Sequence, residues 1–206
     1  NGFTLGKISD NSLMINFLHH GMYPDFKYQQ KSASYARPYK FDPRTKEITK
    51  NVNSVLEEIR TRFKTDPLNH LKWYLLKKPA LFWSWDTVQG FGDFYVYYVS
   101  KTPYFENKIF QGTHKIMQKL HGLLVIFGLL GSLAAWIYPR FSGLGKNAIY
   151  MARFVAALLI YYTLLHMIGA PFPRYSVPLR PFAYGMAMFF LHCLFMALKS
   201  RKVNSM

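Results

Sequence analysis

The sequence predicts an all-α integral membrane protein, in which a polar first part of mixed, mostly irregular and helical structure precedes three membrane-spanning helices. All 10 Asp and Glu residues lie in residues 1–119, whereas residues 120–206 carry eight Lys or Arg residues and no carboxylate. The second part also contains three long apolar runs separated by Pro and Gly residues. The chain therefore divides into a polar domain, 1–119, and a transmembrane region, 120–206.

The apolar runs place the expected spans at residues 120–138, 148–170 and 182–198. The first run has 19 positions without a charged side chain, about 28 Å as a helix at about 1.5 Å per residue. Pro171 ends the second run and Pro181 precedes the third, because proline cannot continue a helix. The third run is close to the short limit for spanning.

The net charge of +16 raises the question of nucleic acid as a partner. No zinc-finger, RNA-platform or basic-helix motif is present, and the basic residues of the second part flank the apolar runs. Anionic lipid or a positive-inside bias explains that pattern better, so no nucleic-acid partner is expected. Cys193 is the only cysteine and lies in an apolar run, which excludes an intrachain disulfide and a thiolate metal cluster.

Residues 1–50 show turn residues rather than periodicity, and the apolar segment Leu13 to Leu18 is too short to span a membrane. Tyrosines alternate here with basic residues, as at Tyr23, Lys27 and Tyr28. Two interpretations stay open. The segment is either a loop that closes over a polar or sugar-bearing ligand, or a surface loop packed by its own aromatic residues.

An interfacial amphipathic helix is predicted at about 54–64. Ser54 and Glu57 have the spacing of a capping box, and apolar residues then recur at helical intervals.

A second helix is predicted at about 67–78, with Asp66 as its N-cap and Pro67 at its first position. Three leucines lie on one face and lysines elsewhere, which is typical of an amphipathic helix at a bilayer surface. A tryptophan cluster follows the pattern of an aromatic belt, so these residues are predicted at the membrane interface: Trp73, Trp83 and Trp85.

Few residues suggest catalysis or metal binding. Asp86 and Asp93 flank a Gly-rich turn and are either general bases or turn formers. The apolar residues 94–99 that follow are expected either to lie along the surface or to pair as a strand. The seven histidines offer no three converging ligands with a carboxylate in the second part, so no metal site is predicted. No catalytic residue is assigned. His166 is expected as a hydrogen-bond donor near the arginines that follow it.

The segment between the second and third runs, PFPRYSVPLRP, is basic and rich in proline. Its prolines stop the chain from spanning, which places Arg174 and Arg180 at a membrane surface. Guanidinium groups there suit a lipid phosphate. The alternative is that both are snorkelling arginines of an ordinary connecting loop.

Charges on the short loops predict the orientation. Basic residues follow the first and third runs, so those ends are expected in the cytoplasm and residues 1–119 and 171–181 outside an inner (cytoplasmic) membrane. A polar domain without a signal sequence needs an earlier span for export, so we expect the chain to be the C-terminal part of a larger protein.

A helix that ends before P-x-P-R-Y-x-x-P-x-x-P and is followed by a last apolar helix resembles the closing segment of bacterial polytopic glycosyltransferases of the C superfamily (GT-C). These enzymes depend on a lipid carrier and include relatives of the protein O-mannosyltransferases and of the lipid A aminoarabinose transferase. NGFTLGKISDN resembles the entry into a periplasmic loop of such proteins. HGMYPDF and LKWYLLKKPALFWSW are similar to their amphipathic elements on the outer membrane face.

The resemblance implies a GT-C-like helical bundle and a hexosyltransferase that moves a sugar from a polyprenyl-phosphate donor to an unidentified acceptor on the extracytoplasmic face of the cell envelope. Its catalytic acidic residue would lie upstream of this fragment. By motif Arg174 and Tyr175, and by proximity Arg180, would line the carrier phosphate with His166. No cofactor is certain, and a divalent metal in the parent enzyme finds no support here.

Two alternatives remain at this point. The chain is also consistent with a non-enzymatic three-span membrane protein whose outside domain binds a partner or glycan. A transporter is the third interpretation, but spans without an acidic residue make a poor ion path.

Overall fold

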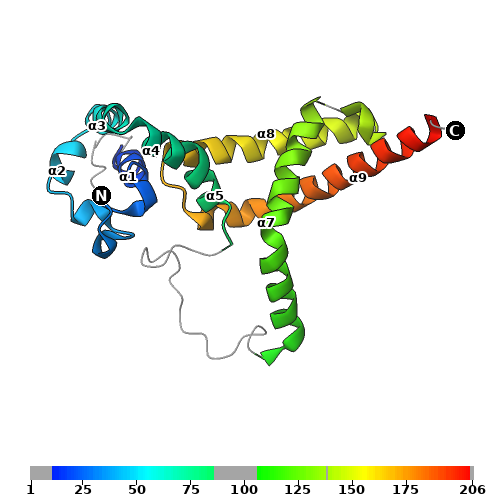
Figure 1. The fold of residues 1–206 in the computed structure, drawn as a ribbon, viewed down its shortest axis with the longest axis horizontal. Coiled ribbons are helices and arrows are strands. Elements are labelled where there is room, and N and C mark those ends of the chain that lie inside the picture. Colours follow the sequence, from blue (N-terminus) through cyan, green and yellow to red (C-terminus); the bar gives the residue numbers. More distant parts are fainter. Residues whose placement is uncertain (1–10, 86–105, 138, 205–206) are drawn as a thin grey trace, which may run out of the picture. The chain divides into compact units, whose positions relative to one another are not determined.

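The computed structural model describes residues 11–85, 106–137 and 139–204 (Figure 1). Within these ranges every regular element is helical. In this described part of the chain, three helical segments are long and apolar enough to cross a membrane: α7 (Lys108–Ile137), α8 (Lys146–Ile168), and Pro173–Ser200, which joins a 3₁₀ turn to most of α9 (Arg180–Asn204). The prediction of a helical chain with three apolar helices of spanning length is therefore confirmed.

The helix ends differ from the predicted ones. Helix α7 begins at Lys108 rather than near residue 120, and α9 continues to Asn204 beyond the predicted end at 198. Polar residues at a helix end carry no hydropathy signal, although they extend the same hydrogen-bonded helix. The predicted boundary at residue 119 thus falls inside α7. The predicted surface segment or strand at 94–99, with Asp86 and Asp93, lies outside the described residues.

The chain forms two compact units. Of the described residues, the first unit contains 11–81 and 165–172, and the second contains the remainder.

The first unit is built from short helices: α1 (Ser12–Gly21), α2 (Thr45–Ile48), α3 (Val52–Thr65), α4 (Pro67–Lys72) and α5 (Lys78–Phe82), of which Phe82 already belongs to the second unit. A π-helical turn, Trp73–Lys77, joins α4 to α5, and 3₁₀ turns lie at Pro24–Phe26, Ser32–Ser34 and Pro38–Lys40. The segment 1–50, expected to be irregular, therefore contains a regular helix, α1, which buries Leu18.

The helix caps explain one correct and one wrong boundary. Asp66 caps α4 as predicted, because its carboxylate accepts the Asn69 N–H at 3.3 Å. The predicted capping box at Ser54 is wrong, since Asn51 caps α3 instead and accepts the Ser54 N–H at 2.9 Å. Asn51 has the extended backbone that an N-cap requires.

Two apolar clusters form the core of the first unit. One contains Phe26, Trp73, Ala170 and Phe172, so the residues that follow α8 are part of it. The other packs Leu18, Met22, Tyr23, Ile48 and Val55.

Helices α7 and α9 pack against each other in the second unit, where Figure 1 shows them crossing. The α7 face at this contact is made of small residues, because Gly128, Gly131, Ser132 and Ala135 are all buried. A Cβ atom on Gly131 would overlap the carbonyl oxygen of Met186 on α9. Small side chains let two backbones approach closely, which is how apolar helices associate in a membrane.

Candidate functional site

Arg180, the first residue of α9, forms the centre of a polar cluster in the second unit. One Nη atom donates to the carbonyl oxygens of Ser84, at 2.9 Å, and Trp85, at 3.4 Å. The guanidinium carbon lies 5.1 Å from the centre of the Trp85 ring. Its Nε atom is buried and has no hydrogen-bond partner among the residues that the structure describes. The side chain is thus held on a neutral surface with donor capacity left over.

His121 of α7 links this cluster to Tyr184 of α9. Its Nε2 lies 2.6 Å from the Trp83 carbonyl oxygen and its Nδ1 lies 2.7 Å from the Tyr184 hydroxyl. A carbonyl only accepts hydrogen bonds, so Nε2 carries the proton, and in the neutral ring Nδ1 accepts from Tyr184. The His121 side chain is 2% exposed, which fixes its orientation.

The segment Phe82 to Trp85 connects the three long helices at this point. Trp83 is buried, and its ring N–H donates to the Thr163 hydroxyl of α8 at 3.1 Å. The Trp83 carbonyl oxygen accepts a hydrogen bond from His121 of α7. The Trp85 carbonyl oxygen accepts one from Arg180 of α9. Four residues therefore tie together the N-terminal half of α7, the C-terminal half of α8 and the start of α9.

The charge of Arg180 has no counter-ion in the described part of the chain. All ion pairs found there lie within residues 25–77, and the partners of Arg180 are backbone carbonyls. Carbonyl dipoles orient a guanidinium without neutralising it. The start of a helix also favours negative charge, so the two features act on an anion in the same direction.

Arg174 and Tyr175 lie in the 3₁₀ turn Pro173–Leu179. The Arg174 Nη2 donates to the Tyr175 hydroxyl at 3.0 Å, and its guanidinium carbon is 4.9 Å from the Tyr175 ring centre. The Tyr175 ring is exposed. A role of this pair in binding phosphate stays a prediction.

The remaining predicted residues, His166 and Trp73, belong to the first unit. His166 is buried, and its Nδ1 lies 3.0 Å from the Ala170 carbonyl oxygen. The ring N–H of Trp73 donates to the Gly21 carbonyl at 2.8 Å, and the side chain is 2% exposed. Trp73, like Trp83, is a core side chain; whether either lies at the depth of a membrane interface stays a prediction, as does the approach of His166 to the arginines.

A buried polar network also lies in the first unit. The Tyr23 hydroxyl donates to Asp42 at 2.7 Å and lies 3.0 Å from His19 Nε2. Arg62 bridges Asp42, at 3.2 Å, and Glu58, at 2.9 Å. Burial, with a smaller effect of the neighbouring His20, lowers the pKa of His19 to about 4. Burial and the bond to Asp42 raise the pKa of Tyr23.

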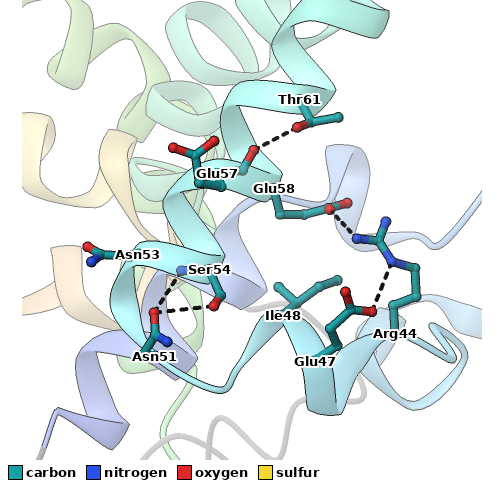
Figure 2. Close-up of a pocket in the computed structure, with 9 residues that line it drawn as sticks. All are labelled: Arg44, Glu47, Ile48, Asn51, Asn53, Ser54, Glu57, Glu58 and Thr61. Carbon is teal, nitrogen blue, oxygen red and sulfur yellow. Dashed lines mark hydrogen bonds and ion pairs between the residues drawn. The ribbon is translucent and has the colours of Figure 1, made fainter.

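Two polar hollows border this network. Figure 2 shows the first, of about 420 Å³, where Arg44 lies between Glu47 and Glu58 and pairs with both. The second, of about 370 Å³, is lined by Tyr28, Gln29, Gln30 and Asp42 among others, and Gln29 and Gln30 have φ values of 48° and 58°. Such backbone strain in non-glycine residues clusters at binding sites.

No metal centre is found in the part of the chain that the structure describes, since no three His, Cys, Asp or Glu side chains converge there.

Sequence reasoning missed His121 and Tyr184 as members of the Arg180 cluster, and Lys78 as a buried residue. His121 stands out as a polar residue in an apolar run, which was the one local signal available. Lys78 follows Lys77 in a basic helix and has the pattern of a surface residue.

No protein family model matches this chain, and no similar protein was found among curated proteins or solved structures.

Proposed function

We propose that this chain forms the carrier-binding part of a membrane glycosyltransferase. The enzyme would move a sugar from a polyprenyl-phosphate donor to an acceptor on the extracytoplasmic face of the inner membrane. The observation that carries the proposal is Arg180, a half-buried guanidinium held by neutral carbonyls, without a counter-ion among the described residues, at the start of a helix of spanning length.

The geometry suits a lipid-linked phosphate for two reasons. The cluster joins three helices long enough to span, so an amphiphile can place its chain along them and its phosphate at Arg180. The Trp85 ring and the carbonyls of Ser84 and Trp85 orient the guanidinium in advance, which lowers the entropy cost of binding an anion.

In the reaction, Arg180 would stabilise the negative charge that develops on the leaving phosphate, and it would not itself move a proton. Arg174 is the second cation that we place near the phosphate, through the same proline-rich turn. No residue of this chain is assigned as the general base.

The test is photo-crosslinking of a diazirine-bearing polyprenyl phosphate to the full chain in nanodiscs. Arg180→Gln should lower labelling about tenfold or more, since a hydrogen bond to a charged group contributes about 1.5–3 kcal/mol. Arg180→Lys should retain part of it.

Arg153→Gln is the matched control. Arg153 also donates to a helix carbonyl, that of Ala135 at 3.0 Å, and lies over a tryptophan, Trp136 at 5.3 Å. Its position near the start of α8 is far along that helix from Thr163, so labelling should stay within about twofold. Equal labelling of the Arg180 and Arg153 variants would overturn the proposal.

A second candidate is a protein that binds a glycan or partner through its first unit. The strained Gln29 and Gln30 backbone beside a polar hollow favours it. Arg180→Gln should then leave binding of soluble oligosaccharides unchanged while Gln30→Gly weakens it, as glycan-array measurements on the detergent-solubilised chain would show.

A further inference from the structure

Residues 67–81 carry a row of exposed leucines on the first unit. The side chains are 79% exposed at Leu68, 50% at Leu71, 52% at Leu75 and 65% at Leu76. Helical residues three and four apart share a face, so the first three form one row. A globular protein normally buries such a face.

The same helical segment buries its other side. Trp73 packs against Phe26 at a ring distance of 5.6 Å and donates to Gly21, while Lys78 is fully buried. Trp73 and Lys78 therefore anchor the segment in the core of the first unit. The leucines lie on the opposite side of the helix and face outward.

Lys78 fixes the level of this segment relative to the end of α8. Its Nζ donates to the carbonyl oxygens of Met167 at 2.9 Å, Ile168 at 3.3 Å and Gly169 at 2.8 Å. Helix α8 ends at Ile168 and is long and apolar enough to cross a membrane. Apolar residues continue to the last residue of α8, so an α8 that spans the bilayer has this end close to the membrane boundary. The leucine row is thus attached at the level of that boundary.

The charge of the segment fits a lipid surface. From Pro67 to Trp85 the chain contains no Asp or Glu. Lys72 is exposed on α4, between the turns that carry Leu71 and Leu75, whereas Lys77 pairs with Asp25. Cations beside an apolar row are the pattern of helices that lie in the plane of an anionic interface.

We propose that the row Leu68, Leu71, Leu75 and Leu76 inserts into the outer layer of the bilayer, with lipid as its only cover. The segment then lies flat at the boundary where α8 ends, and Lys78 sets its depth. This goes beyond the proposed function, because it holds for any activity of the chain.

The experiment uses the full chain with Cys193→Ser as background, reconstituted in nanodiscs. An NBD dye is attached at Leu71→Cys, and at Glu57→Cys as the control, since Glu57 is exposed on α3 of the same unit. Lipids with a doxyl quencher at acyl carbon 5 report contact with the bilayer. We expect blue-shifted emission and strong quenching at position 71, and neither at position 57.

Two results would overturn the proposal. Emission at position 71 like that at 57 would mean that the row faces water. A blue shift without doxyl quenching would mean that protein, such as a second copy of the chain, covers it. If Leu71→Cys prevents folding, Leu68→Cys replaces it, because a side chain 79% exposed makes few packing contacts.

Discussion

Lys78 shows how much a single side chain can determine in this protein. The last carbonyls of any helix lack intrahelical partners, and the three N–H groups of the Lys78 ammonium meet three of them at the end of α8. Burial lowers the pKa of Lys78 to about 6. A neutral amine has only two N–H groups, so the three carbonyl contacts and the negative end of the helix dipole favour the ammonium against this effect of burial.

Lys78→Met should destabilise the first unit by about 3 kcal/mol, because the carbonyls lose their donors while the shape is kept. Hydrogen exchange followed by mass spectrometry should show faster exchange around residues 165–172. Lys72→Met, at an exposed lysine on α4, serves as the control and should change exchange little. Identical exchange in the two variants would mean that Lys78 does not hold the helix end.

His19 predicts an acid-sensitive first unit. Its pKa of about 4 in the folded chain lies below the ordinary value of 6.5, so between these values the unfolded chain binds the extra proton. Stability from this group is complete above about pH 6.5 and is lost as the pH falls toward 4. Burial lowers the pKa of His20 too, which adds to the same slope.

His19→Gln should therefore flatten the fall of the unfolding midpoint between pH 6.5 and 4.5, measured by thermal scanning in detergent. At pH 7.5 the variant should be less stable than the native chain, because the bond to Tyr23 is altered. An unchanged slope would assign the acid sensitivity to other groups.

Some residues of the candidate site can be predicted from the sequence and others cannot. Arg180 is predictable, since an arginine between two prolines at the edge of an apolar run has to lie near a helix start. His121 and Tyr184 meet across 63 positions, and Lys78 meets Met167 across 89. No local pattern encodes such pairs, because only the packing of the helices brings them together.

At the scale of elements, the contact between α7 and α9 depends on glycines. Gly131→Ala should lower stability by about 2 kcal/mol or more, since the new methyl group overlaps the Met186 carbonyl. Gly122→Ala, the same change in the same helix, meets nothing within 4 Å and should be neutral or stabilising by up to about 1 kcal/mol. Unfolding in graded SDS measures both, and equal midpoints would contradict the close approach.

The existence of the long helices could be predicted because hydropathy is a local property of the chain. Their ends could not, since Lys115 and Lys119 continue α7 without any apolar signal. Helix caps are predictable only in part. The Asp66 cap was predicted correctly, whereas at α3 two candidate caps, Asn51 and Ser54, stand three residues apart and only the backbone of Asn51 decides between them.

At the scale of the whole molecule, the charge pattern predicts topology. In right-side-out membrane vesicles, with Cys193→Ser as background, a membrane-impermeant maleimide should label Val177→Cys, which lies in the turn before α9. Asn147→Cys, at the start of α8, should be labelled only after permeabilisation. The reverse pattern would invert the orientation and remove Arg180 from the extracytoplasmic face.

The bond from Lys78 to the end of α8 also sets an order of assembly during synthesis. Lys78 and Met167 are 89 residues apart, so at about 5–20 residues per second the ribosome needs roughly 5–20 s to supply the partner. Phe172, which stacks on Phe26 in the first unit, arrives later still. The first unit therefore cannot complete its core until α8 has been made, so its folding has to follow the synthesis of both α7 and α8.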